Sequence, residues 1–335
     1  MPFGPAVVEL TGYRMTRARI RRSMLQTGCA AGVFLLAIPA ASARNSTKTD
    51  APADSIAPSP KAMLILDSGF QDLYKLDFTG AREQFQDYQK EQPADPLGKA
   101  AEAATYLYEQ FNQKGVLTSK FFLDDDKFLG GVDGSAANNH NAAFLAANDA
   151  AREAARARLK TDPHDREALL AITMADGMES NYDELIEKKE IPALTLMRQA
   201  EAEARALLAI DPSASDAYVA LGTSNYVIGC LPGYKKMFLW FGGIHGDKDR
   251  GMAQLETAAQ DGHYLAPFAK ILLALASERE HQNDRAHTLL TELTKEFPEN
   301  PLFAHELALL DQRMDQRSTA SLPSDDATAA SFIHF

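Results

Sequence analysis

Residues 274–298 have the sequence ALASEREHQNDRAHTLLTELTKEFP, in which small and large apolar residues follow a definite spacing. The small Ala274 is followed by Ala286, then by the large Leu290, and the stretch ends at Pro298. Ala, Leu, Glu, Lys and Arg dominate it, and all of these residues favour helix. Proline cannot continue a helix, because it lacks an N–H and its ring clashes with the preceding turn. We therefore expect two helices, the second ending just before Pro298.

The same spacing recurs near the other end of the chain, at residues 69–93, GFQDLYKLDFTGAREQFQDYQKEQP. Here Gly69 and Ala81 are the small residues, Phe85 is the large one, and Pro93 closes the unit. Four predicted helices end before such a proline: Pro93, Pro163, Pro212 and Pro298. A pattern that returns along the chain indicates a repeat.

Two further features follow from alignment on these prolines. Asp162 and Asp211 precede two of them and are predicted to cap the next helix, because an aspartate side chain accepts free N–H groups at a helix start. Ten positions after each proline stands a small residue, which would let two helices approach closely: Ala103, Thr173, Gly222 and Ala308.

These positions resemble the tetratricopeptide repeat family, whose unit of about 34 residues is a pair of antiparallel helices with small, large and proline residues at fixed places. The resemblance implies an all-α fold over residues 61–315, a helical-hairpin repeat solenoid of the α-α superhelix type. The prolines are unevenly spaced, and an insertion near Tyr182–Pro192 displaces one helix, so we expect about five or six irregular pairs. The family resemblance implies a scaffold or adaptor that binds a protein or peptide.

A second resemblance covers residues 226–262, YVIGCLPGYKKMFLWFGGIHGDKDRGMAQLETAAQDG. A Leu-Pro opening, an aromatic-rich helix and a Gly-x-x-Gly-Asp-Lys-x-x-Gly run are similar to the tetratricopeptide repeat protein 39 family. The matching residues are Leu231, Pro232, Gly243, Gly246, Asp247, Lys248, Gly251 and Leu255. This resemblance implies a helical adaptor and supplies no catalytic residue.

The two ends of the chain have a different composition from the body. A run of arginines, a short apolar run and the small-residue site ending at Ala43 predict a signal peptide over residues 1–43. The general secretory route and the twin-arginine route both stay open, as do Met1 and Met15 as the start. Residues 44–60 are predicted to be a disordered linker and residues 316–335 a flexible tail. We therefore expect a periplasmic or secreted protein, cleaved near Ala43.

Charge and cysteine content narrow the classes of partner. The formal net charge is −12, and removal of the basic leader makes it more negative, so nucleic acid is not an expected partner. Cys230 is the single cysteine after the leader, which excludes a disulfide within the mature chain.

Motifs with catalytic or metal-binding spacing are absent from the sequence: His-Glu-x-x-His, Cys-x-x-Cys, Gly-x-Ser-x-Gly and the phosphate-binding loop. We predict no catalytic residue, no cofactor and no metal. The run Asp124–Asp126 is interpreted as a loop held by neighbouring phenylalanines, since calcium loops place their acids at alternate positions. An all-helical periplasmic enzyme, for example one acting on carbohydrate with carboxylates from distant helices, stays open as an alternative.

Six residues are predicted to contact a partner. Asn225, Tyr226, Glu278 and Arg279 fall on first helices of their pairs, which line the concave surface in tetratricopeptide arrays. Trp240 and Phe241 end an apolar segment that holds the only tryptophan. We interpret that segment as core, with an exposed contact as the alternative. Exposed, Met237–Phe241 would bind a partner or rest at a membrane surface. The oligomeric state stays open.

Overall fold

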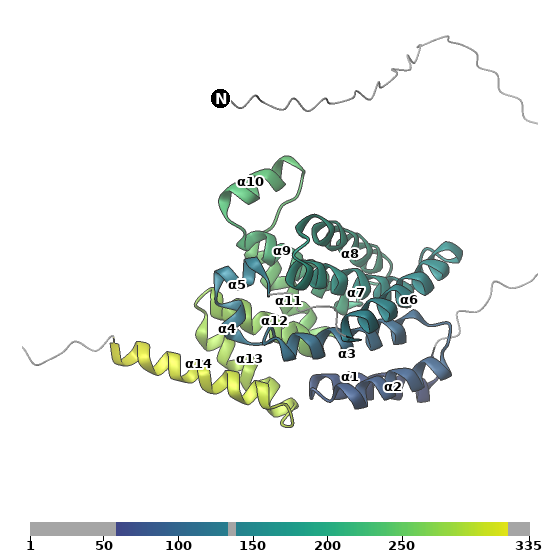
Figure 1. Cartoon of the computed structure of the whole chain (residues 1–335), viewed down its shortest axis with the longest axis horizontal. Coiled ribbons are helices and arrows are strands. Elements are labelled where there is room, and N and C mark those ends of the chain that lie inside the picture. The colour runs from purple at the N-terminus through teal and green to yellow at the C-terminus, as the bar shows by residue number, and fades with distance from the viewer. Residues whose placement is uncertain (1–57, 133–138, 321–335) are drawn as a thin grey trace, which may run out of the picture. The chain divides into compact units, whose positions relative to one another are not determined.

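The computed structural model describes residues 58–132 and 139–320 of the chain. Within these two ranges every regular element is a helix, which confirms the all-α class (Figure 1). The predicted signal peptide, residues 1–43, lies outside them, as does nearly all of the predicted linker, residues 44–60. The last helix extends to Ala320, so the predicted tail, residues 316–335, begins within a helix and otherwise lies outside.

The helices of the described ranges form consecutive antiparallel pairs. The pairs are α1 (Pro60–Tyr74) with α2 (Phe78–Glu91), α3 (Pro96–Gln113) with α6 (Asn139–Thr161), α7 (Arg166–Tyr182) with α8 (Glu190–Ile210), α9 (Tyr218–Cys230) with α11 (Lys248–Asp261), and α12 (Ala266–Arg279) with α13 (Asn283–Glu296). A single helix, α14 (Pro301–Ala320), packs against α13. Successive pairs also contact each other, so this is a helical-hairpin repeat.

Insertions explain the uneven spacing of the prolines. The short helices α4 (Ser119–Phe122) and α5 (Asp125–Gly130) separate the members of the second pair, and α10 (Gly233–Phe241) separates those of the fourth. A π-helical turn, η1 (Asp183–Glu187), follows α7, and a 3-10 turn, η2 (Ser215–Ala217), precedes α9. The expected insertion after Tyr182 is therefore present.

The four predicted helix ends are all confirmed, since α2, α6, α8 and α13 each stop two residues before their proline. In each case the residue before the proline still donates its N–H to the helix, as from Phe297 to the Leu293 carbonyl at 2.9 Å. The expected capping role of Asp162 and Asp211 is wrong. Each carboxylate accepts an N–H two residues onward, at 2.9 Å, and so stabilises the turn.

After three of the four prolines, a capping side chain lies two residues beyond the proline instead; after Pro212 this position is Ala214, which has no capping side chain. Asp95 accepts the N–H of Leu97 at 2.9 Å, Asp165 that of Ala168 at 3.0 Å, and Asn300 that of Leu302 at 2.9 Å. The proline sits inside a short turn, closed for example by the Asp165 N–H on the Asp162 carbonyl at 3.2 Å. The new helix begins only after this turn, and for that reason the cap falls later in the sequence.

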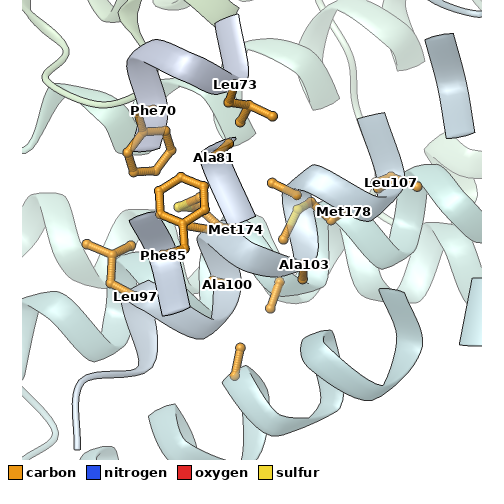
Figure 2. Packing of buried hydrophobic residues seen from close by; sticks show 14 of the residues in the cluster. Phe70, Leu73, Ala81, Phe85, Leu97, Ala100, Ala103, Leu107, Met174 and Met178 are labelled. Carbon is orange, nitrogen blue, oxygen red and sulfur yellow. The ribbon is translucent and has the colours of Figure 1, made fainter. Parts of the chain in front are cut away.

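Small residues do mark close helix contacts, as expected. A Cβ added to Gly69 on α1 would lie 2.4 Å from the ring of Phe85 on α2, and Figure 2 shows this ring between the two helices. A Cβ on Gly251 would lie 2.8 Å from the carbonyl oxygen of Gly222, so the backbones of α9 and α11 touch. Ala308 is exposed, because no helix follows α14 in the described chain.

The first and last helices contact each other. Tyr74 at the end of α1 donates to the carbonyl of Tyr264, in the turn before α12, at 2.8 Å. The Tyr74 carbonyl accepts from the side chain of Asn300, directly before α14, at 2.8 Å. The rings of Phe70 and Tyr264 stack at 4.9 Å between centroids. In Figure 1 the start of α14 lies beside the end of α1. The repeat therefore closes on itself here, and at this seam the inner surface is filled by packed side chains.

Candidate functional site

The six residues predicted to contact a partner fall into two structural groups. Asn225, Tyr226 and Glu278 are buried, each about 6% exposed, and Arg279 is largely covered. Trp240 and Phe241 are exposed, at 59% and 74%. The structure does not bring the six residues together on one surface.

Asn225 and Tyr226 bind neighbouring helices. The Asn225 amide donates to the Leu221 carbonyl at 3.0 Å and to the Gln254 side chain at 2.8 Å, which ties α9 to α11. The Tyr226 hydroxyl donates to the Glu280 carboxylate at 3.2 Å, at the C-cap of α12. Burial, aided by the nearby Cys230 thiol, raises the pKa of Tyr226 above its usual value.

Glu278 and Arg279 bind helices on the other side of α12. Glu278 forms an ion pair with Arg313 on α14, and burial raises the pKa of Glu278 while Arg313 opposes the shift. Arg279 donates to the Phe122 carbonyl and to the Asp125 carboxylate, the latter at 2.5 Å. All four inner residues have clear packing roles, and direct contact with a partner stays a prediction for them.

The acidic run Asp124–Asp126 is a helix start. Asp124 caps α5 by accepting the N–H of Lys127 at 3.2 Å, and Asp125 pairs with Arg279. The neighbouring Phe121 is buried, as expected for a held loop. Within residues 58–132 and 139–320, no group of three His, Cys, Asp or Glu side chains could hold a metal ion.

Helix α10 carries the exposed aromatic residues. Four of its large apolar side chains are more than half exposed: Tyr234 at 62%, Met237 at 53%, Trp240 at 59% and Phe241 at 74%. These four residues are called the α10 surface below. The interpretation of this segment as core is therefore wrong. The partners of α10 along the chain, α9 and α11, touch through Gly222 and Gly251, so they leave no groove between them for an inserted helix.

The base of α10 is built by the glycine-rich run of the sequence. Gly243 adopts a positive φ of 76°, which turns the chain back. A Cβ on Gly246 would lie 2.5 Å from the backbone nitrogen of Gly229, so only glycine lets the returning backbone lie against α9. Asp247 then caps α11 on the Arg250 N–H at 2.9 Å, and Lys248 pairs with Glu280 at 2.6 Å. The glycine-rich segment and the two residues after it therefore serve to pack α11 against α9 and α12.

Helix α10 has one ion pair to a neighbouring helix and a hollow beneath it. Lys235 pairs with Glu190 of α8 at 3.1 Å. A hollow of about 340 Å³ lies under α10, and its lining includes Met237, Trp240, Ile228 and Ile244. Trp240 is thus both exposed to solvent and part of a hollow that an apolar side chain of a partner could enter. Figure 1 shows α10 standing away from the paired helices.

Sequence reasoning missed two exposed apolar residues near this region. Tyr234 belongs to the α10 surface, and Ile191, in the first turn of α8, is 80% exposed next to Glu190. Tyr234 follows a Pro-Gly break directly, which was the available signal. For Ile191 the sequence gives no signal, because its exposure depends on where α8 begins.

The enzyme alternative requires carboxylates from distant helices, whereas the two acids that lie close together here come from the paired helices α7 and α8, in a packed seam. Asp176 on α7 is fully buried and lies 2.8 Å from the Arg152 guanidinium of α6. Burial and the negative charge of Asp176 raise the pKa of Glu203 on α8 to about 8. Asp176 has no exposed surface, so a substrate cannot reach both acids.

Comparison with known proteins finds a similar solved structure. No family model and no curated protein matches the chain. A solved structure described as a thermophilic TPR protein of Thermus thermophilus is similar over 75% of this chain and 99% of its own, with 16% identity and a TM-score of 0.40. A likeness at this level carries no argument about function.

Proposed function

We propose that this protein is an exported helical-repeat scaffold that binds a protein partner through the α10 surface, without catalysis. One observation carries the proposal: four large apolar side chains stand exposed on an insertion whose base is rigidly packed. Contiguous exposed apolar groups on a soluble protein commonly mark an interaction site.

The composition of the α10 surface suits a protein interface. Trp and Tyr are enriched among residues that dominate binding energy, because each buries a large area with few rotatable bonds. The hollow beside Trp240 offers a place where a partner side chain would be partly withdrawn from water. Lys236 is exposed on the same helix, so we expect the partner to present an apolar groove with acidic residues at its edge.

Export is the second part of the proposal and rests on the leader sequence alone. Cell fractionation followed by N-terminal sequencing tests it. We expect the mature protein outside the cytoplasm, beginning near position 44. A cytoplasmic protein that retains residues 1–43 would contradict export and leave the binding proposal standing.

Binding is tested by comparing the mature protein with the double variant Trp240→Ala, Phe241→Ala. Cross-linking in periplasmic extract should capture a partner that the double variant loses, since removal of such an anchor costs about 2 kcal/mol or more, roughly 30-fold in Kd. Leu64→Ala is the matched control, because Leu64 on α1 is an equally exposed apolar residue, at 67%.

Three results bear on this proposal. Capture of the same partner by wild type and by Leu64→Ala, but not by the double variant, supports the proposal. Equal capture by all three proteins contradicts it. Flotation of wild type with liposomes, lost in the double variant, would assign the α10 surface to a membrane instead. None of the described helices is both long and apolar enough to cross a membrane.

A further inference from the structure

A second feature lies where the first and last helices, α1 and α14, meet. A pocket of about 80 Å³ is enclosed there by α1, α3, α12, α13 and α14 and is partly open to solvent. We call it the closure pocket. Its walls are almost entirely apolar and include Leu73, Phe268, Ile271 and Phe303.

Two carboxylates interrupt these apolar walls. Glu278 on α12 and Glu306 on α14 both line the closure pocket, and they are only 6% and 5% exposed. Glu278 is paired with Arg313. Oxygen Oε2 of Glu306 accepts the backbone N–H of Ser119 at 3.1 Å. Its other oxygen, Oε1, is shielded from solvent and has no hydrogen-bond partner among the described residues.

A buried carboxylate oxygen without a donor is costly, because that oxygen has lost its water and gained no hydrogen bond in exchange. In a pocket with apolar walls, such an oxygen is best satisfied by a positively charged donor that carries its own apolar group. The pocket has about half the volume of a cavity of about 150 Å³ that holds one benzene molecule, so it encloses about two or three carbons of that group. The end of a chain of about four carbons would lie at the open side of the pocket.

From this geometry we infer that the closure pocket binds a small primary amine, with its ammonium group on Oε1 of Glu306 and its short alkyl chain against the apolar walls. The site is independent of the α10 surface. Nothing is transformed there, because binding needs only desolvation of the alkyl chain and one charge-assisted hydrogen bond.

The test uses mature wild-type protein, with n-butylamine, n-butanol and butyrate as probes. Ligand titration by NMR should show binding of butylamine, weaker binding of butanol and none of butyrate. Glu306→Gln keeps the side-chain shape and an oxygen for the Ser119 N–H, but removes the charge. We expect this variant to weaken the binding of butylamine roughly 10- to 100-fold, the range for a hydrogen bond to a charged group, and to leave the binding of butanol unchanged.

Two more variants keep the test decisive. Glu83→Gln, at an exposed position of α2, is the matched charge control and should bind butylamine like wild type. Ile271→Trp fills the pocket while both carboxylates stay in place, and should abolish binding of both butylamine and butanol. Circular dichroism of each variant checks that the fold is retained.

Several outcomes would overturn the inference. Butylamine affinity that is equal in wild type and Glu306→Gln would remove the role of the carboxylate. Binding that survives Ile271→Trp would place the ligand elsewhere. A peptide carrying an internal lysine that binds with the same dependence on Glu306, while butylamine does not bind, would replace the free amine by a peptide side chain. Failure of these tests leaves the α10 proposal untouched, because its variants lie on another helix.

Discussion

Glu203 on α8 has a carboxyl group that the fold keeps away from water. Burial is the main cause of its raised pKa of about 8, and the neighbouring Asp176 adds to it. In the unfolded chain the group ionises near its ordinary pKa of 4.5. Between these two pH values the folded state binds more protons than the unfolded state, so this group makes stability fall as the pH rises from about 4.5 to about 8.

Glu203→Gln should remove this penalty. We expect the variant to be more stable than wild type by about 1 to 2 kcal/mol near pH 9, and nearly equal to it near pH 4, where the wild-type group is mostly neutral in both states. Guanidinium unfolding at the two pH values measures the difference. Glu153→Gln, at an exposed site of α6, should leave the unfolding free energy unchanged at both pH values. A gain from Glu203→Gln that is the same at both pH values would contradict the account.

Two glycines in helices have opposite surroundings and so predict opposite effects. A Cβ at Gly69 would overlap the fully buried ring of Phe85, so Gly69→Ala should destabilise the protein by about 1 to 3 kcal/mol. A Cβ at Gly177 in α7 meets nothing within 4 Å. Gly177→Ala should therefore stabilise by about 0.5 to 1 kcal/mol, because alanine favours helix. Chemical denaturation measures both, and changes of the same sign would contradict this packing.

Some of these residue roles were visible in the sequence and others were not. The small residue at Gly69 and the large one at Phe85 fitted the repeat spacing, since both positions recur relative to a proline, and the structure adds that the two are in contact. The capping role of Asp165 was missed, because the turn that contains Pro163 delays the helix start. The partners of Asn225 and Tyr226 lie 29 and 54 residues away, and no local pattern specifies such distant neighbours.

At the scale of elements, the ends of helices before a proline were predictable, because the proline ring itself prevents the helix from continuing. The position of α10 was not, because its apolar composition suits both a core helix and a binding helix. What decides between them is whether α9 and α11 touch directly, and the glycines that permit this lie on both sides of the insertion. An aromatic-rich helix is therefore expected at the surface when it is inserted between two helices that touch through glycines, even though its apolar composition would also suit the core.

Helix α10 should be less stable than its neighbours. It has only nine residues, and such short helices depend on tertiary contacts for stability. Its large side chains make few such contacts, since four of them are mostly exposed. Hydrogen–deuterium exchange followed by mass spectrometry should show residues 234–241 exchanging much faster than α9 or α11. Protection of α10 equal to that of α11 would mean that its apolar face is covered.

At the scale of the whole described chain, contact between the first and last helices has the widest consequences. It fills the inner surface that an open array would use for a peptide, it creates the closure pocket, and it leaves the α10 surface as the main exposed apolar site. The sequence predicted the pairs but not this closure, because each pair is specified locally whereas the closure joins Tyr74 to residues 190 and 226 positions away, before α12 and before α14.

A double-mutant cycle across the seam measures the closure. Phe70→Ala and Tyr264→Ala each remove one ring of the stacked pair, and the double variant removes both. If the ends of the repeat meet in solution, the two effects on unfolding free energy will be non-additive, with a coupling of about 0.5 to 1.5 kcal/mol. Strict additivity of the two substitutions would show that the rings do not touch and that the repeat is open.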